Sequence, residues 1–549
     1  MKITLAQINY HVGNFEKNSK LIIEAIGKAK REKSDLVVFS ELALTAYPPL
    51  DLLEYRGFID RCAEATEIIA RECRGIAAII GAPSINTDSS GKKLYNTAYF
   101  MNEGKVCDKI HKSLLPTYDI FDEARYFEPS GTFRLIPFKG KKLALTICED
   151  LWDEQDFENE FSSSRLYAVS PMDELAKLKP DLIINISASP FAYNRTDIKR
   201  KIFTSKAEKF KLPVFMVNQV GGNTDLIFEG NSMVIGPKGN LVDLFPAFRE
   251  HIASYELTDV IKSKIDLKYE PDRIAMIYEA LVTGLKDYFG KMNFPSAVIG
   301  LSGGIDSALC LCLAAKALGP SKVRVLLLPS MYSSDHSVDD AIRLSRNLGV
   351  KYDIINIEKA YRAIEESLSD IMSNTEPDVT EENIQSRLRS ILLMAVSNKY
   401  GNILLNTSNK SETAVGYTTL YGDMAGSISV LGDVYKTDIY RLAHYINRED
   451  TLIPDSIIKK APSAELRPGQ KDTDSLPDYE ILDRMLYQYI ELQKPVNEIT
   501  GENINPGLVK EVIRLINSNE FKRFQAPPIL RISSKAFGMG RRMPLVGSY

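Results

Sequence analysis

The first half of the chain alternates short apolar runs with longer amphipathic stretches. In some of the intervals, apolar residues recur at helical spacing, as in Asn14–Lys33 and Arg195–Phe210. The segment Leu94–His111, with Asn102-Glu103-Gly104 at its centre, is typical of an antiparallel hairpin. Runs typical of strands lie at Ile3–Ile8, Leu36–Phe39, Ala77–Ile80, Thr97–Met101, Leu143–Ile147, Leu182–Ile186 and Val214–Val217. The pattern predicts a layered α/β unit with several antiparallel strand pairs.

A second α/β pattern follows a polar, weakly periodic stretch. We therefore expect a first domain at 1–257, a linker at 258–270 and a second domain at 271–549. Pro271 is expected in the first turn of a helix, where its missing N–H costs nothing. Strands joined by helices imply an open, doubly wound parallel sheet whose ligands bind beyond the strand C-termini. Its expected strands contain Val298 and Ile299, Val323–Leu327, Tyr352–Ile355 and Asn402–Leu405, and its expected helices lie near 334–348, 357–372 and 380–400.

Two further segments of the second domain carry a pattern. Pro454–Pro477 is rich in proline and charge, which is typical of a loop. In the helix expected at 380–400, apolar residues recur every 3.6 positions and predict a core-facing stripe. The stripe consists of Ile384, Leu388, Ile391, Leu392 and Ala395.

Bulk composition changes this picture little. The 549 residues are 44% hydrophobic and 26% charged, as in ordinary globular proteins, and the length requires more than one core. A net charge of −4 gives no reason to expect nucleic acid or an acidic membrane as a partner. We find no signal peptide and no apolar run of membrane-spanning length, so we expect a cytoplasmic protein. The cysteines lack metal-site spacing, and apart from Cys148 we expect them to be reduced core thiols.

The segment Ala297–Ala308 joins an apolar strand to a helix through a Ser-Gly-Gly turn. Gly303 and Gly304 allow a ligand to approach the backbone closely, and the free N–H groups at the helix start suit a phosphate. The sequence is not a Walker A loop, because no Lys follows the glycines. A purely structural loop is the alternative. The surrounding polar residues favour a phosphate site, and SGGIDS resembles the pyrophosphatase loop of enzymes that cleave ATP to AMP and pyrophosphate. Asp306 beside the phosphates would then suit magnesium.

Three reactive side chains of the first half follow apolar strands. Cys148 ends the run Leu143–Ile147, Glu41 follows Leu36–Phe39, and Lys112 follows the expected hairpin. A buried strand cysteine is the alternative for Cys148, since a nucleophilic thiol needs a nearby base or cation. The five histidines offer no persuasive partner, although His111 could serve.

Strand-Glu, Lys-x-x-Leu-Pro and strand-Cys-Glu, in that order, resemble the nitrilase superfamily. The resemblance implies that Glu41 is a general base, that Cys148 is the nucleophile, and that Lys112 and the N–H after Cys148 stabilise an oxyanion. Glu123 matches a second active-site glutamate of that superfamily. The alternative for Glu123 is a surface carboxylate paired with Arg125.

The two halves together resemble the glutamine-dependent NAD+ synthetases. ELALTAYPPLDLL, HKSLLPTYDIFDEARYF and ICEDLW carry the resemblance in the first half, and GLSGGIDSALCLCLAAKALG, NTSNKSETAVGYTTLYGDMAG and LGDVYKTDIYRLA carry it in the second. It implies a nitrilase-like αββα sandwich followed by a Rossmann-like doubly wound parallel sheet. It also implies that glutamine supplies ammonia for the ATP-dependent amidation of deamido-NAD+, with Mg2+ as cofactor, in a homo-oligomer. The products would be NAD+, AMP, pyrophosphate and glutamate.

The resemblance assigns site residues one by one. In the first half, glutamine contacts fall on Tyr118, Ser189 and Arg195, for which turn or helix-cap duty is the alternative. In the second half, deamido-NAD+ contacts fall on Asn383, Glu412 and Lys522, and magnesium ligands on Asp306 and Glu412. ATP contacts fall on Gly300, Leu301, Ser302, Gly303, Gly304, Ile305, Asp306, Ser307, Thr407 and Lys436.

At two positions the sequence departs from the pattern of the family, and both positions concern how the dinucleotide is bound. Many ammonia-only relatives have His where this chain has Phe521, and an acidic residue near the position of Ser427. The basic tail Lys522–Arg542 could otherwise be a solvated terminus.

Two other functions remain open from the sequence. One is a different two-domain amidotransferase, although Met1 and Lys2 exclude an unprocessed N-terminal-Cys glutaminase. A Cys-His-Glu glutaminase would require a downstream histidine in the first domain, and none lies beyond His251. The other is a nucleotide sensor without catalysis, which the set of reactive side chains disfavours.

Overall fold

The computed structural model describes residues 1–153 and 166–547. The chain divides into two compact units, Met1–Glu270 (unit 1) and Pro271–Tyr549 (unit 2). Each unit has its own sheets and its own buried core.

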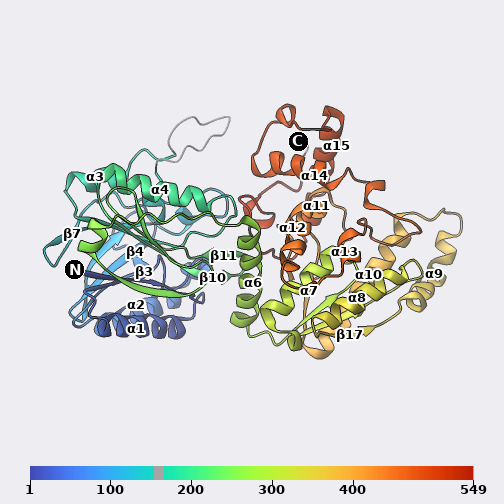
Figure 1. Ribbon diagram of the computed structural model, residues 1–549, viewed down its shortest axis with the longest axis horizontal. Coiled ribbons are helices and arrows are strands. Elements are labelled where there is room, and N and C mark those ends of the chain that lie inside the picture. Colours follow the sequence, from blue (N-terminus) through green and yellow to red (C-terminus); the bar gives the residue numbers. More distant parts are fainter. Residues whose placement is uncertain (154–165, 548–549) are drawn as a thin grey trace. The chain divides into compact units, whose positions relative to one another are not determined.

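Unit 1 contains two six-stranded sheets with helices on their outer faces, as Figure 1 shows for α1 and α2 on one side and α3 and α4 on the other. A small antiparallel ribbon pairs β10 (Val220–Asn223) with β11 (Leu226–Glu229). The first sheet has the order β14 (His251–Glu256), β1 (Lys2–Gln7), β2 (Leu36–Val38), β3 (Ala77–Ile85), β4 (Leu94–Asn102) and β5 (Lys105–His111). The second has the order β13 (Leu241–Leu244), β12 (Met233–Ile235), β9 (Val214–Asn218), β8 (Leu182–Ser187), β7 (Lys141–Ile147) and β6 (Ile136–Phe138).

The main core of unit 1 lies between the two sheets. Leu5 and Val38 of the first sheet pack in one buried cluster with Leu145 and Val217 of the second. A separate cluster joins the first sheet to α1 (Phe15–Arg31) and α2 (Arg56–Glu72), and another joins the second sheet to α3 (Pro171–Lys177) and α4 (Thr196–Phe210). This layering confirms the αββα sandwich.

The expected hairpin and helices of unit 1 are present with small shifts. β4 and β5 pair antiparallel across the turn at Glu103 and Gly104. The first helix begins at Phe15, because Asn14 caps it by accepting a hydrogen bond from the Lys17 N–H.

Unit 2 has a five-stranded, all-parallel sheet. Val298 packs with Leu393 of α10 (Val379–Tyr400), while Ala297 and Ile299 point to the opposite face and are also fully buried. Both faces are therefore covered, which confirms the doubly wound sheet. Its order is β17 (Lys351–Ile354), β16 (Val323–Leu327), β15 (Ala297–Gly300), β18 (Ile403–Asn406) and β19 (Ile428–Ser429). The other principal helices are α6 (Arg273–Met292), α7 (Ile305–Leu318), α8 (Asp335–Asn347), α9 (Glu358–Met372), α12 (Lys436–Ile446), α14 (Tyr479–Leu486) and α15 (Pro506–Ser518).

Three segments differ in detail from the expectation. Pro271 precedes α6, because the Asp272 carboxylate caps the helix by accepting from the N–H groups of Ile274 and Ala275. The expected linker at 258–270 begins inside a helix, α5 (Leu257–Lys262), which packs against β14. The segment Pro454–Pro477 contains the short helix α13 (Asp455–Lys459) and a 3₁₀ turn.

The predicted core stripe of α10 was right in part, since Leu388 is buried and Leu392 packs against the core of the sheet. Ile391 is 60% exposed and Ala395 is exposed, whereas the buried face carries Gln385, Ser386 and Ser390. The spacing of apolar residues identifies a face but not what that face meets. Here the inner face lines a cavity (below), so small polar residues occupy it.

The cysteines follow the expectation with one exception. Cys107 is exposed on the edge strand β5, whereas Cys62, Cys73, Cys310 and Cys312 are buried free thiols. Among the residues that the structure describes, no helix combines the length and the apolar composition needed to cross a bilayer.

Candidate active sites

Three strand ends of unit 1 bring the predicted reactive side chains together. Glu41 follows β2, Lys112 follows β5, and Cys148 follows β7 of the facing sheet. The Lys112 ammonium donates to Glu41 Oε1 at 2.7 Å and to Glu123 Oε2 at 2.8 Å. All four side chains are buried. The alternative for Glu123 was wrong, because Arg125 instead pairs with acidic residues on the surface.

Further donors hold the two glutamates in place. Asn96 Nδ2 donates to Glu41 Oε1 at 2.7 Å, and the Ala188 N–H donates to Glu41 Oε2 at 3.0 Å. The Tyr47 hydroxyl donates to Glu123 Oε1 at 3.1 Å. Asn96 and Tyr47 were missed from the sequence, because only the fold brings them to the carboxylates.

Burial and charge oppose each other within this cluster. Burial alone would lower the pKa of the Lys112 ammonium, but Glu123 and Glu41 outweigh it and raise that pKa well above its usual value. Burial also raises the pKa of the Cys148 thiol well above its usual value, and Glu41 adds to this effect while Lys112 opposes it. The thiol is therefore protonated at rest and needs a base to become a nucleophile.

His111 is not a candidate base. Its ring stacks on Tyr95 and its Nδ1 shares a hydrogen bond of 2.8 Å with Thr97. Burial lowers the pKa of His111 to about 4.

The turn at Cys148 is strained and is held from both sides. Cys148 has φ of +43° at the start of a 3₁₀ turn, a left-handed conformation that L-residues avoid. The Asp150 carboxylate accepts from the Ile147 N–H at 3.0 Å and from the Leu114 N–H at 2.9 Å. Asp150 thus ties the turn that carries the thiol to the loop that carries Lys112.

A further buried carboxylate, Glu149, directly follows the nucleophile in the chain. It accepts from the hydroxyls of Tyr118 at 3.0 Å and Tyr167 at 2.9 Å. Burial raises the pKa of Glu149 to about 7, against the opposing attraction of Lys112 and Arg195. Arg195 is the N-cap residue of α4, but its side chain forms no cap hydrogen bond.

The structure therefore places two of the three predicted glutamine contacts, Tyr118 and Arg195, around Glu149. Ser189 follows β8, where its N–H donates to Asn218 Oδ1 at 2.9 Å. The sequence signal for Glu149 was its place in the Cys-Glu motif. The hydroxyls that hold it could not be assigned from the sequence.

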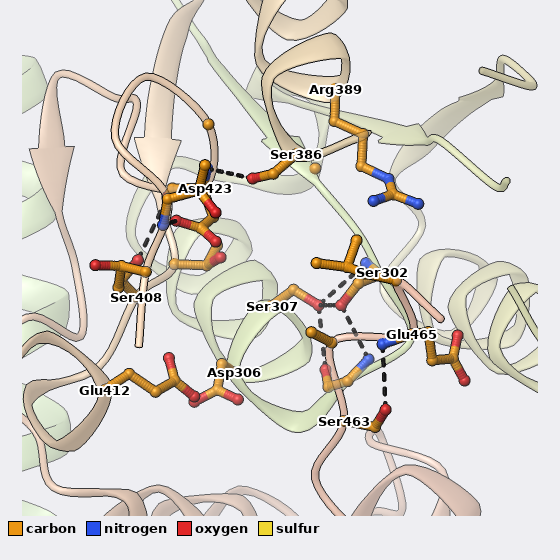
Figure 2. Close-up of a pocket in the computed structure, with 18 of the residues that line it drawn as sticks. Ser302, Asp306, Ser307, Ser386, Arg389, Ser408, Glu412, Asp423, Ser463 and Glu465 are labelled. Atoms are coloured by element: carbon orange, nitrogen blue, oxygen red, sulfur yellow. Dashed lines mark hydrogen bonds between the residues drawn. The ribbon is translucent and has the colours of Figure 1, made fainter. Parts of the chain in front are cut away.

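In unit 2, the predicted phosphate turn joins β15 to α7. Gly303 has φ of +79°, and a Cβ there would lie 2.3 Å from the Ser337 carbonyl oxygen, so only glycine fits. Gly304 has φ of −90° and needs no left-handed freedom. The Ser307 hydroxyl donates to the Gly304 carbonyl oxygen at 3.1 Å and also accepts from the Ser302 N–H at 3.2 Å (Figure 2).

The loop after β18 reaches the same sheet edge as this turn. Figure 2 shows Asp306 and Glu412 directed toward one another across the site. The Lys436 ammonium contacts both, at 2.5 Å from Asp306 and 3.1 Å from Glu412. Asn409 Nδ2 donates to Asp306 at 2.8 Å. Since β15 and β18 are the neighbours at which the strand order reverses, the site lies at the topological switch point.

The two carboxylates are suited to a divalent cation. Burial raises the pKa of Glu412 to about 7, and the negative charge of Asp306 works in the same direction against Lys436. A cation between the two would relieve this crowding. Two carboxylates plus phosphate oxygens are a usual Mg2+ ligand set, and in the described part of the chain no third His, Cys, Asp or Glu completes a protein-only metal site.

A cavity of about 550 Å³ opens from this turn. It is lined by the whole turn except Gly303, and by Thr407, Lys436, Asn383 and Lys522. The Asn383 amide oxygen accepts from Thr419, and the Lys522 ammonium donates to the Gly416 and Thr418 carbonyl oxygens at 2.8 Å each. The volume of the cavity is typical of a site that binds a small molecule. Four other lining residues were not predicted from the sequence: Arg389, Asp423, Ser463 and Glu465 (Figure 2).

Phe521 and Ser427 are the two positions at which the sequence departs from the family pattern. Phe521 lines the cavity, whereas Ser427 is not among the lining residues. The basic tail Lys522–Arg542 packs against the rest of unit 2 and is not a solvated terminus. Asp433 accepts from the N–H groups of Ile532 at 2.8 Å and Ser533 at 2.7 Å, and Leu530 is fully buried.

Comparison with known proteins agrees with the division of the chain into units 1 and 2. Residues 2–155 match the carbon-nitrogen hydrolase family, and residues 277–526 match the NAD synthase family. A glutamine-dependent NAD(+) synthetase of Synechocystis sp. is 40% identical and aligns over 100% of this chain and 99% of its own length. The chain belongs to the glutamine-dependent NAD+ synthetase family. The corresponding enzyme of Acinetobacter baylyi is 38% identical over 100% of this chain and 98% of its own.

A solved member of the family has the same fold. The glutamine-dependent NAD+ synthetase of Acinetobacter baumannii, determined with adenosine diphosphate, superposes with a TM-score of 0.78 at 35% identity. The alignment covers 99% of this chain and 98% of that one. The full-length match includes both candidate sites.

Proposed function

We propose that this chain is a glutamine-hydrolysing NAD+ synthetase that amidates deamido-NAD+ with ammonia from glutamine. The observation that carries the proposal is the presence of two different reactive centres, a thiol within an acid-lysine cluster in unit 1 and a glycine-turn cavity with paired carboxylates in unit 2. The direct test is product analysis with glutamine, ATP, deamido-NAD+ and Mg2+. We expect NAD+, AMP and pyrophosphate in equal amounts, with at least as much glutamate. ADP and phosphate in place of AMP and pyrophosphate would contradict the proposal.

In unit 1, Glu41 takes the proton of the Cys148 thiol as the sulfur attacks the glutamine carboxamide. The Lys112 ammonium and the N–H after Cys148 stabilise the oxyanion. The leaving amine receives the proton and departs as ammonia, which leaves a glutamyl thioester. Glu41 then activates the water that releases glutamate. Glu123, whose pKa burial raises to about 7, keeps Lys112 in place through two hydrogen bonds.

The surroundings of Glu149 carry opposite charges suited to a free amino acid. Arg195 would bind the α-carboxylate of glutamine, and Glu149 would bind its α-ammonium, with Tyr118 and Ser189 nearby. Because burial raises the pKa of Glu149 to about 7, this carboxylate is charged above that pH and neutral below it.

We expect Glu149→Gln to lower kcat/KM for glutamine by about 10- to 100-fold at pH 8, since a charged hydrogen bond is lost. For the unmodified enzyme, kcat/KM should fall as the pH drops below about 7, where Glu149 takes up a proton. The matched substrate is glutaramate, which lacks the α-amino group. With glutaramate, Glu149→Gln should change kcat/KM by less than threefold. An equal loss of kcat/KM with both substrates would exclude this role for Glu149. Glutamate and glutarate release measure the two reactions.

In unit 2, the turn at Gly300–Ser307 would hold the ATP phosphates, with Thr407 and Lys436 as further ATP contacts. Asp306 and Glu412 would hold Mg2+, which when bound neutralises charge on the phosphates as pyrophosphate leaves. Asn383, Glu412 and Lys522 would contact deamido-NAD+. The nicotinate carboxylate of that substrate attacks the α-phosphate to give an adenylate. Ammonia then displaces AMP.

We also propose that the protein is a cytoplasmic homo-oligomer. The oligomeric part of the proposal rests on the resemblance to the family, and Ile391, which is 60% exposed on α10, is the side chain chosen to test it. Light scattering should show a mass above the 61.5 kDa of one chain, and Ile391→Glu should shift it downward. A mass of one chain for the unmodified protein would exclude self-association.

A further inference from the structure

The start of α12, which carries Lys436, is held by other parts of the chain. The N-cap residue of α12, Tyr435, provides no side-chain cap, although the first N–H groups of a helix have no partner within it. Instead the Lys436 N–H donates to the Ser411 hydroxyl oxygen at 2.9 Å, and the Thr437 N–H donates to Asp483 Oδ2 at 2.9 Å. Two distant residues therefore supply the cap that the local sequence lacks.

Ser411 and Asp483 also contact one another. The Ser411 hydroxyl donates to Asp483 Oδ1, so the same oxygen of Ser411 links Lys436 to Asp483. Ser411 is fully buried and Asp483 is 6% exposed. Asp483 comes from α14, Ser411 from α11 (Lys410–Val415), and Lys436 from α12. One carboxylate thus joins three helices at the edge of the cavity.

The residue after Ser411 is Glu412, so the network fixes both ends of the Lys436–Glu412 pair. The Lys436 ammonium reaches Glu412 at 3.1 Å and Asp306 at 2.5 Å. Asn409 completes the arrangement, since its Oδ1 caps α11 at the Glu412 N–H while its Nδ2 donates to Asp306. A displacement of about 1 Å in such a group can cost about 100-fold in rate.

We propose that Asp483, acting through Ser411, is a positioning residue for the synthetase reaction. Neither residue lines the cavity, so neither is expected to contact substrate. The inference rests on the proposed roles of Lys436 and Glu412. Asp483 sets the position of α12 relative to α11, and with it the positions of the ammonium and the carboxylate that face the ATP phosphates.

The test is Asp483→Asn in the full chain, assayed for ammonium-dependent NAD+ formation. The amide keeps the shape but loses one acceptor, so we expect kcat to fall about 10- to 100-fold, with KM for ATP and deamido-NAD+ within threefold. Ser411→Ala should likewise lower kcat and leave both KM values within threefold. The double variant should be no slower than the slower single variant, because both changes break one network. A kcat within twofold of the unmodified enzyme, or fully additive losses, would overturn the proposal.

Asp340→Asn is the matched control. Asp340 is a buried aspartate of α8 that accepts from the Ser456 hydroxyl at 2.5 Å, so the same substitution neutralises a buried, hydrogen-bonded carboxylate outside the network. If Asp340→Asn lowers kcat as much as Asp483→Asn, the effect is general destabilisation and the proposal fails. Lys436→Ala separates this proposal from the proposed function. A fully active Lys436→Ala would refute the role of Lys436, whereas an inactive one beside a normal Asp483→Asn would refute only the positioning role.

Discussion

Replacing Cys148 by Ala should abolish NAD+ formation from glutamine and leave formation from ammonium intact. Alanine removes the only atom that can form the thioester, so the glutamine-dependent rate should fall on the order of 10⁴-fold or more. Ammonium enters after this step and needs only the cavity of unit 2. The measurement is NAD+ production with each nitrogen source at saturating ATP and deamido-NAD+.

The chain offers a matched control in Cys107→Ala. Cys107 is an exposed thiol of the same unit on β5, and its replacement should leave both activities unchanged. Loss of the ammonium-dependent reaction in Cys148→Ala would show that the two centres do not work separately. Retention of the glutamine-dependent reaction would remove Cys148 from the chemistry altogether.

Replacing Asp306 by Ala should abolish NAD+ formation from both nitrogen sources. The substitution removes one of the two carboxylates beside the phosphate turn and frees the Lys436 ammonium and Asn409 from their contacts with it. We expect a loss on the order of 100-fold or more, comparable with the removal of one group that stabilises a charged transition state.

Asp353→Ala tests whether this loss is specific. Asp353 lies on β17 of the same sheet and pairs with Arg324 at 2.7 Å, away from the cavity lining. Its replacement should leave both rates within about threefold, as expected for a partly exposed ion pair. If Asp306→Ala keeps its ammonium-dependent rate, the magnesium and phosphate roles assigned to this turn are wrong.

Side chains that directly follow apolar strands could be predicted from the sequence. Glu41 and Lys112 follow strands of the first sheet, and Cys148 follows a strand of the facing sheet. The same reasoning placed the loop at Thr407 beside the turn at Ser302. Strand ends are local features, so a single sequence can reveal them.

Partners that depend on long-range packing could not be found in this way. Glu149 is held by Tyr118 and Tyr167, which lie 31 and 18 residues away in the chain. Asp483 is 72 residues from Ser411. The stripe predicted for α10 was confirmed at Leu388 and Leu392 but not at Ile391 and Ala395, since periodicity does not say whether a helix face meets a core or a cavity. The prediction that Pro271 lies in the first turn of a helix was wrong for a local reason, because the neighbouring Asp272 caps the helix.

The pairing of β1 with β14 bears on the order in which the chain matures on the ribosome. Met1 and Leu257 are joined by a backbone hydrogen bond, so unit 1 closes on its own first strand once about half the polypeptide has emerged. Unit 2 differs, because Leu530 and Ile532 belong to its buried core. The amide-cleaving half can therefore close early in synthesis, while its ATP-using counterpart cannot close before these two residues have been added.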